Sequence, residues 1–216
     1  QMRQWSAFAG LSDPGPEAKR MAEYVSDLIP NGATLQIGMG TPSNLLPALG
    51  AFDMKHDLGI HSEMAAPGFV DLIEKGVVTG KYTKTHPGRA RFSALSTTNV
   101  RERNWAHNNP LVELFQSQDV VNIQNIAAID NMVCVNNALS IDLSGQINVE
   151  TVFGGRHIAG TGGQTEIHIG TVLSKGGRAI TLLRSTALGG SVSRIVPQFE
   201  EGAAVSIPRT FADTVI

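Results

Sequence analysis

The sequence has 216 residues, of which 42% are hydrophobic and 17% charged, and its formal net charge is −2. This length is sufficient for one large domain with a substantial core. Positive and negative residues are interspersed without a run of Lys or Arg, which argues against a basic nucleic-acid-binding face. No apolar stretch approaches the ~18 residues of a membrane helix. The single cysteine, Cys134, cannot form an internal disulfide, which favours a reducing, cytoplasmic setting.

The first half of the chain predicts alternating strands and helices, because its apolar residues change between strand-like runs and helical spacing. The predicted elements, in chain order, are a helix over 16–28, a strand over 33–38, a helix over 45–52 capped by Ser43 or Asn44, a strand over 56–62, a helix over 67–78, a loop-rich stretch over 79–109 and a short helix over 110–118.

The second half is rich in strand signals and poor in helix signals. The predicted strands lie over 120–125, 130–145, 145–151, 165–174, 178–186, 193–199 and 203–210, with a hairpin turn at 143–146. No internal repeat or composition shift marks a domain boundary. We therefore predict one α/β domain over 1–216, with an open sheet that is parallel at first and then mixed or partly antiparallel.

A first glycine loop, Gly38-Met39-Gly40, follows a predicted strand and precedes a predicted helix. Glycines let a backbone approach a ligand closely, and amides at the start of a helix favour anions. A dinucleotide fold would need a third glycine where this chain has Ser43. Glu63, 23 residues after Gly40, nevertheless stands near the position of a ribose-binding acid. A purely structural turn is equally consistent with these residues.

The second glycine loop, AGTGGQ at 159–164, is denser. Three glycines in four residues cost backbone entropy that a plain connection would not need. A dinucleotide fold gives no reason for a second loop of this kind, whereas a β-bulge or hairpin turn remains an alternative. Lys175, followed by two glycines, would either bring an ammonium group to a phosphate or form a tight turn, and the turn is favoured.

Glu63 itself follows a predicted strand and admits several interpretations. An exposed glutamate at a strand end is usually only solvated. A metal site with His61 is disfavoured because the six histidines show no tight ligand spacing, and we predict no metal. Ser62 lacks the G-x-S-x-G surroundings of a nucleophilic serine, and Cys134 lies in an apolar, strand-like run.

Taken together, the motifs resemble those of the acetyl-CoA hydrolase/4-hydroxybutyrate CoA-transferase family, a branch of the class I CoA-transferases. The resemblance extends from about Pro16 to the last residue. The motifs that carry it, in order, are ATLQIGMGTPSN, HDLGIHSEM, VCVNNALSIDLSGQIN, AGTGGQTEIHIG and SKGGRAI. The resemblance implies an open α/β fold of the class I CoA-transferase type. It also implies that this chain is the C-terminal catalytic half of a longer enzyme, with an N-terminal half as its partner and a homodimer as the common assembly.

The family resemblance also implies residue roles. The glutamate of the family's H-[ST]-E-M motif is the nucleophile, and Glu63 occupies that position. Backbone amides of the two glycine loops stabilise the oxyanion, which implies this role for Met39 and Gly162. The implied contacts to coenzyme A are Gly38, Gly40, Asn136, Gly160, Gly163 and Lys175.

A carboxylate nucleophile suits the transfer of CoA between acids, because anhydride and glutamyl-CoA intermediates conserve the free energy of the thioester, and the kinetics should be ping-pong. The resemblance implies CoA transfer between an acyl-CoA and a small acid such as acetate or 4-hydroxybutyrate. An acyl-CoA hydrolase and a non-catalytic dinucleotide- or CoA-binding module remain alternatives. We expect the chain to need the other half for activity, because the family's active site lies between the halves.

Overall fold

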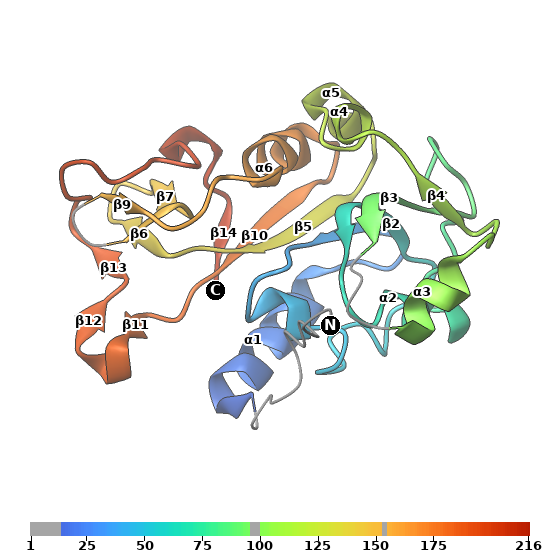
Figure 1. Ribbon diagram of the computed structural model, residues 1–216, viewed down its shortest axis with the longest axis horizontal. Helices are drawn as coiled ribbons and strands as arrows, with labels where there is room; N and C mark the ends of the chain where they lie inside the picture. Colours follow the sequence, from blue (N-terminus) through green and yellow to red (C-terminus); the bar gives the residue numbers. More distant parts are fainter. Residues whose placement is uncertain (1–13, 96–99, 153–154) are drawn as a thin grey trace, which may run out of the picture.

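A seven-stranded sheet forms the centre of the computed structural model, which describes residues 14–95, 100–152 and 155–216 (Figure 1). The strands, in sequence order, are β1 (Thr34–Ile37), β2 (Gly59–Ala65), β3 (Ala90–Leu95), β4 (Val112–Leu114), β5 (Met132–Asn137), β10 (Arg178–Leu182) and β14 (Thr214–Val215). Their spatial order is β14-β10-β5-β1-β2-β3-β4. Every neighbouring pair is parallel, so all carboxyl ends of the strands meet at one edge of the sheet.

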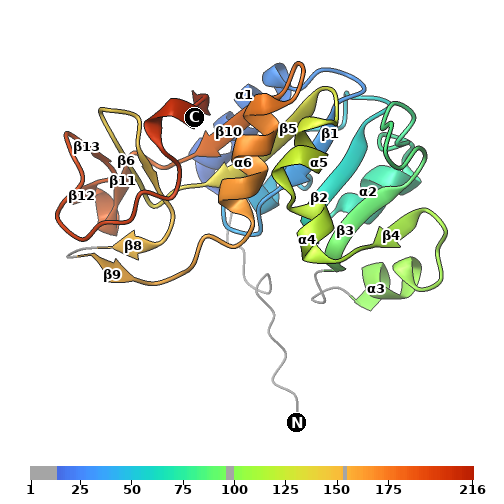
Figure 2. The ribbon, with the colours of Figure 1, turned by 90° about the horizontal axis from the view of Figure 1, so that it is seen from above.

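Helices cover both faces of this sheet, as a parallel sheet requires. One face carries α1 (Gly15–Leu28) and α2 (Phe69–Glu74), whose apolar side chains share a core cluster with β1, β2 and β3. The opposite face carries α4 (Ser117–Val120), α5 (Ile123–Ala127) and α6 (Gln164–Leu173), which lie over the sheet in Figure 2. A further helix, α3 (Val100–Ala106), lies near β4 at the edge of the sheet.

The central strand β5 shows how the two cores are separated. Val133 and Val135 are fully buried on the face of α1, whereas Met132 and Cys134 are fully buried on the face of α5 and α6. Burial raises the pKa of the Cys134 thiol to about 12. The thiolate form is therefore strongly disfavoured, which agrees with the absence of a nucleophilic role for this cysteine.

A smaller β-rich unit follows the carboxyl end of β5 and surrounds the return from β10 (Figures 1 and 2). Its strands are β6 (Ser140–Asp142), β7 (Ile147–Asn148), β8 (Thr151–Val152), β9 (Arg156–His157), β11 (Thr186–Ala187), β12 (Val192–Ser193) and β13 (Ile195–Val196). Three short 3₁₀ helices complete the secondary structure: η1 (Ser43–Leu45), η2 (Leu188–Gly190) and η3 (Arg209–Phe211). Among the described residues, antiparallel pairing is confined to this unit, so the predicted mixed sheet is in fact a parallel sheet with small antiparallel additions.

Several predicted elements agree with the structure, namely the helix over 16–28, the strands over 33–38 and 178–186, and the turn at 143–146. The turn is held by Asp142, whose Oδ1 accepts hydrogen bonds from the backbone N–H groups of Ser144 and Gln146. The stretch over 79–109 is less loop-rich than predicted, because it contains β3 and α3.

Other predicted elements are wrong. Residues 45–52 form the last residue of η1 and then consecutive turns rather than a helix, and Gly50 among them adopts a φ of 76°. Residues 110–118 contain β4 instead of a helix. Residues 120–125, predicted as a strand, contain the start of α5. Asn122 caps this helix by accepting hydrogen bonds from the backbone N–H groups of Gln124 and Asn125. Residues 165–174 form α6 instead of a strand, because a helix there buries Ile167 and Thr171 on one face.

Candidate active site

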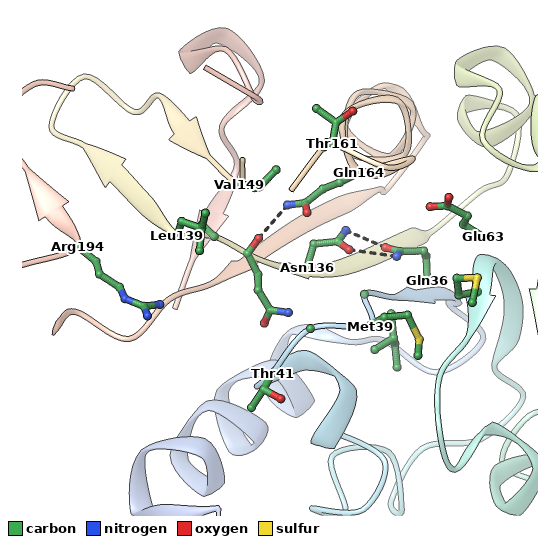
Figure 3. Close-up of a pocket in the computed structure, with 17 residues that line it drawn as sticks. Gln36, Met39, Thr41, Glu63, Asn136, Leu139, Val149, Thr161, Gln164 and Arg194 are labelled. Atoms are coloured by element: carbon green, nitrogen blue, oxygen red, sulfur yellow. Dashed lines mark hydrogen bonds between the residues drawn. The ribbon is translucent and has the colours of Figure 1, made fainter. Parts of the chain in front are cut away.

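The order of the central sheet places a crevice between β1 and β5. From β1 the chain continues to β2, β3 and β4 on one side, and later returns to β5 and β10 on the other. Ligands of open α/β sheets bind outside the carboxyl ends of the strands at such a reversal. A cavity of about 470 Å³ opens at this position (Figure 3). Its walls come from the first glycine loop, β2, the end of β5 and the loop before α6.

Glu63 lies at one end of this cavity (Figure 3). The strand β2 begins at Gly59 and continues to Ala65, so Glu63 is a residue of the strand and does not follow it, as the sequence had suggested. Its side chain lies on the sheet face that carries α4 and α6, and it is half-buried. The backbone N–H of Gly163 donates a hydrogen bond of 3.0 Å to Glu63 Oε2. The carboxylate is therefore fixed across the crevice by the second glycine loop.

The second glycine loop is the start of α6. Gly163 is the N-cap residue and Gly162 has a φ of 55°, a conformation that glycine adopts without steric cost. The first N–H groups of a helix have no acceptor within the helix, and the helix dipole favours negative charge there. A Cβ atom at Gly163 would lie 2.7 Å from Glu63 Oε2 and 2.6 Å from Val121 Cγ1. Only glycine lets the backbone approach the carboxylate so closely.

A buried amide pair forms the floor of the cavity. Gln36 of β1 and Asn136 of β5 are 4% and 3% exposed, and each donates to the other, at 3.1 Å from Gln36 Nε2 and 2.8 Å from Asn136 Nδ2. Gly38 passes directly over this pair, since a Cβ atom there would lie 2.5 Å from Asn136 Oδ1. The glycine at 38 is thus required by the amide pair beneath it.

The first glycine loop is closed by polar side chains. Ser43 Oγ donates to the carbonyl oxygens of Gly38 at 2.8 Å and Gly40 at 2.9 Å, and Asn137 Nδ2 donates to Ser43 Oγ at 2.8 Å. Among the described residues, no acceptor is found for the backbone N–H groups of Met39 and Gly40. Both residues line the cavity, so an oxygen of a bound ligand could accept from their N–H groups.

His61, two residues before Glu63, lies behind the site and not in it. Its side chain is 2% exposed, and its Nε2 lies 2.8 Å from the carbonyl oxygen of Val120. Burial lowers the pKa of His61 to about 4, although the Val120 carbonyl acts in the opposite direction. The ring is therefore neutral at pH 7 with its proton on Nε2. Ser62 is also buried and donates to the Met64 carbonyl, so neither residue reaches the cavity.

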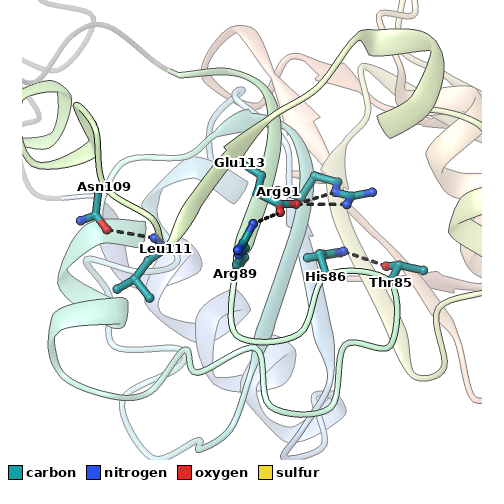
Figure 4. Close-up of polar contacts among 7 residues, drawn as sticks. All are labelled: Thr85, His86, Arg89, Arg91, Asn109, Leu111 and Glu113. Carbon is teal, nitrogen blue, oxygen red and sulfur yellow. Dashed lines mark hydrogen bonds and ion pairs between the residues drawn. The ribbon is translucent and has the colours of Figure 1, made fainter.

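A cluster of charged side chains from β3, β4 and the residue before β3 lies near His61. Arg91 of β3 is 18% exposed and donates to Glu113 Oε2 at 3.0 Å (Figure 4). Its guanidinium carbon lies 4.1 Å from the centre of the Phe115 ring. Arg89 completes the cluster with a 2.6 Å bond to the same carboxylate. The His86 ring lies 5.4 Å from that of His61. All of these charges are paired within the protein, which marks the cluster as structural.

The structure brings together all but one of the residues implied by the sequence. Those that line the cavity or contact Glu63 are Gly38, Met39, Gly40, Glu63, Asn136, Gly160 and Gly163. Gly162 lies beside them, since a Cβ atom there would be 3.8 Å from Glu63 Oε2. Lys175 lies elsewhere, because its carbonyl oxygen accepts from the Asn131 N–H just before β5, at the opposite edge of the sheet. The glycines after it form the tight turn that its residues favoured, with Gly176 at a φ of 73°.

Sequence reasoning missed Gln36, Asn137, Gln164 and Arg194, which also line the cavity. Gln36 had a local signal, since it is a lone polar residue within a buried strand. Gln164 ends the second glycine loop, and its Nε2 donates to the Asn137 carbonyl oxygen at 3.0 Å, which joins α6 to β5. Arg194 lies in the small β unit and had no signal near the motifs. Within residues 14–95, 100–152 and 155–216, no group of three or more metal-ligating side chains occurs, and no helix is long and apolar enough to span a membrane.

Residues 101–216, which include β5, α6 and most of the cavity wall opposite Glu63, match the model of the acetyl-CoA hydrolase/transferase C-terminal domain. The chain is also 40% identical over 203 residues to the 4-hydroxybutyrate coenzyme A transferase of Clostridium kluyveri. The chain belongs to the acetyl-CoA hydrolase/transferase family. The alignment covers 94% of this chain but 46% of that relative, so this family member spans about half the length of the curated relatives it matches.

Solved structures of similar proteins have the same fold. RipA from Yersinia pestis superposes with a TM-score of 0.85 at 35% identity, over 96% of this chain and 46% of that protein. A 4-hydroxybutyrate CoA-transferase from Porphyromonas gingivalis superposes with a TM-score of 0.75 at 30% identity, over 92% of this chain and 45% of that protein. The open α/β fold of this family member is therefore that of the class I CoA-transferases, as the family resemblance implied.

Proposed function

We propose that this chain carries the nucleophile of a CoA-transferase that moves CoA between an acyl-CoA and a small carboxylic acid, with acetate or 4-hydroxybutyrate as candidate acids. One observation carries the proposal: Glu63 lies at the wall of an open cavity and is fixed by the Gly163 N–H at 3.0 Å. The similarity to CoA-transferases over more than nine-tenths of the chain supports the same activity.

A carboxylate in this position can form and break a thioester without loss of its free energy. Glu63 attacks the acyl carbonyl, which releases the CoA thiolate and leaves an acyl-glutamyl anhydride. The thiolate then attacks the glutamyl carbonyl, which releases the first acid and leaves a glutamyl-CoA thioester. An acceptor acid reverses these two steps, so that CoA leaves on the acceptor and Glu63 returns as a carboxylate. No separate base is needed, because the attacking group is a carboxylate and not a hydroxyl or thiol that must first lose a proton.

Each addition passes through a tetrahedral oxyanion, which needs fixed donors. Met39 and Gly40 of the first loop line the cavity that Glu63 also lines, and Gly163 of the second loop donates its N–H to Glu63. We infer that Met39 and Gly162 supply the oxyanion donors, and that the remaining glycines of both loops contact CoA. Loss of one such donor typically raises a barrier by about 3 kcal/mol.

The test uses the full-length protein incubated with an acyl-CoA, followed by proteolysis and mass spectrometry. We expect a CoA-sized adduct on the peptide that contains Glu63, and no adduct in the Glu63→Gln variant, whose amide is nearly the same size but is a poor nucleophile. Exchange of CoA into acetate should be lost in the same variant. Substantial residual exchange by Glu63→Gln would overturn the assignment.

The same experiment separates the two alternatives. A hydrolase would form the adduct but release free CoA at a rate independent of added acid, because water would replace the acceptor. A non-catalytic binding module would give no adduct, and bound NAD in its place would indicate a dinucleotide site. A panel of small acids, with acetate as the reference acceptor, then identifies the preferred substrate.

A further inference from the structure

Arg194 lies at the end of the cavity that is opposite Glu63 (Figure 3). Its backbone is held on both sides, because its N–H donates to the Ser185 carbonyl oxygen at 2.8 Å and its carbonyl oxygen accepts from the Ile141 N–H at 2.9 Å. The side chain is half-buried, yet within the described parts of the chain its guanidinium has neither a hydrogen-bond acceptor nor an ion-pair partner. The residue is thus fixed at its base and unsatisfied at its charged end.

Such an arrangement is unusual for an arginine inside a wall of the protein. A guanidinium carries five N–H donors and is always charged, so its burial without partners is unfavourable. Arg91, which is also half-buried, has the Glu113 carboxylate as a partner (Figure 4) and lies over the Phe115 ring. The missing partner of Arg194 is therefore expected to be an anion from outside the described chain, and the cavity is the route by which it would arrive.

Arg194 also borders a second cavity of about 470 Å³ within the small β unit. The two cavities share Leu139 and Arg194 as wall residues, so a ligand longer than the first cavity would pass the guanidinium to enter the second. The wall of the second cavity is more apolar than polar, with Val192 and Phe199 among its residues. Its polar residues include Asn148, Gln198 and the acidic Glu200. The order along this path is a carboxylate, a glycine-lined channel, a guanidinium and an apolar chamber.

We propose that Arg194 binds a phosphate group of the CoA thioester and that the nucleotide end of CoA lies in the second cavity. This inference rests on the proposed function. CoA has its thiol at one end, a neutral amide-bearing arm, then phosphates, and an aromatic base at the far end. That order matches the order of groups along the two cavities when the thioester carbonyl lies at Glu63. Arginine is suited to this role because its planar fork pairs with phosphate oxygens through two bonds at once.

The alternative source of an anion at Arg194 is the carboxylate of the acceptor acid, and the experiment distinguishes the two. The full-length protein and its Arg194→Leu variant are assayed with acetyl-CoA and with the acetyl thioester of pantetheine, which has no phosphate. We expect the KM for acetyl-CoA to rise about 10- to 100-fold in the variant, with kcat changed much less. The KM for acetyl-pantetheine and the KM for acetate should stay unchanged.

Arg194→Lys keeps the positive charge but not the planar guanidinium. Its KM for acetyl-CoA should lie between that of the unsubstituted protein and that of Arg194→Leu. Arg20→Leu provides a control, because Arg20 is an exposed residue of α1 that is paired with Glu23. An equal rise in KM for both thioesters, or a rise in the KM for acetate alone, would overturn the phosphate assignment. If the unsubstituted protein performs CoA exchange and Arg194→Leu matches it with acetyl-CoA, Arg194 has no role but the proposed function stands. If the unsubstituted protein performs no exchange, the proposed function fails first.

Discussion

The backbone N–H of Gly163 and the Oε2 atom of Glu63 lie 3.0 Å apart, although 100 residues separate them in the sequence. This contact joins the second glycine loop and the start of α6 to the strand that carries the proposed nucleophile. Because Gly163 has a φ of −88°, its glycine is required for space and not for an unusual backbone conformation.

Gly163→Ala should therefore displace the carboxylate without unfolding the protein. The new Cβ atom would lie 2.7 Å from Glu63 Oε2, so the side chain must move and lose its hydrogen bond. We expect CoA exchange to fall by at least about 100-fold, comparable to the loss of an oxyanion donor. The measurement is the rate of acyl exchange, together with the melting temperature.

A matched substitution in the same loop is Gly160→Ala. A Cβ atom at Gly160 would meet nothing within 4 Å. We expect the melting temperature of Gly160→Ala to equal that of the unsubstituted protein. The melting temperature of Gly163→Ala should lie within a few degrees of the same value. Exchange by Gly163→Ala at the unsubstituted rate would show that the contact with Glu63 has no part in the reaction.

The buried pair of Gln36 and Asn136 predicts a non-additive result. Replacement of Asn136 by Leu leaves the Gln36 amide buried without a partner, which should cost about 1–3 kcal/mol of unfolding free energy. Gln36→Leu should cost a similar amount. The double variant should be less destabilised than the sum of the two, because no orphaned amide remains. Urea unfolding of the four proteins measures this coupling, and strict additivity would contradict the structural role of the pair.

Gly170 predicts a reversal of the usual effect of alanine in a helix. Gly→Ala within a helix ordinarily gains up to about 1 kcal/mol. A Cβ atom at Gly170, however, would lie 2.7 Å from Ile126 Cβ, where α6 packs against α5. We therefore expect Gly170→Ala to lower the unfolding free energy by about 1–3 kcal/mol, the usual cost of overpacking. A higher melting temperature for this variant would show that the helices can separate without loss.

The sequence was informative where function depends on local motifs. Both glycine loops and Glu63 lie within short segments, so they could be selected as candidate site residues without knowledge of the fold. The segment 165–174 predicts a strand from its composition, because half of its residues are Ile, Thr or Val, which favour strands. Its packing against α5 outweighs this preference, and the helix in turn makes Gly163 an N-cap.

Long-range pairings could not be predicted from one sequence. The partnership of Gln36 with Asn136 depends on the strand order that places β5 beside β1, and no local pattern specifies that order. Arg194 lies in a short strand-rich stretch, and only the path of the chain back from β10 brings it to the cavity. Lys175 is the opposite case: its local motif could be recognised in the sequence, but it lies at the edge of the sheet away from the cavity.

The buried ring of His61 predicts a pH dependence of stability. An unfolded histidine has a pKa near 6.5, whereas burial holds the pKa of folded His61 at about 4. Between these values the unfolded chain binds a proton that the folded chain does not, so stability falls as the pH decreases from about 6.5 towards 4. At about 1.4 kcal/mol per pKa unit, this residue accounts for a loss of up to about 3 kcal/mol. Burial also lowers the pKa values of His86 and His168, which act in the same direction.

His61→Gln isolates this contribution, because glutamine can donate to the Val120 carbonyl oxygen but does not titrate. We expect the variant to be modestly less stable than the unsubstituted protein at pH 7.5, where the neutral imidazole packs well. Its unfolding free energy should then decrease less steeply between pH 6.5 and pH 4.5. Urea unfolding at several pH values measures both slopes, and equal slopes would show that the proton taken up on unfolding belongs to other groups. Protonation of His61 would also affect the active site, because His61 is bonded to the Val120 carbonyl oxygen. The next residue, Val121, lies beside Gly163, which contacts Glu63.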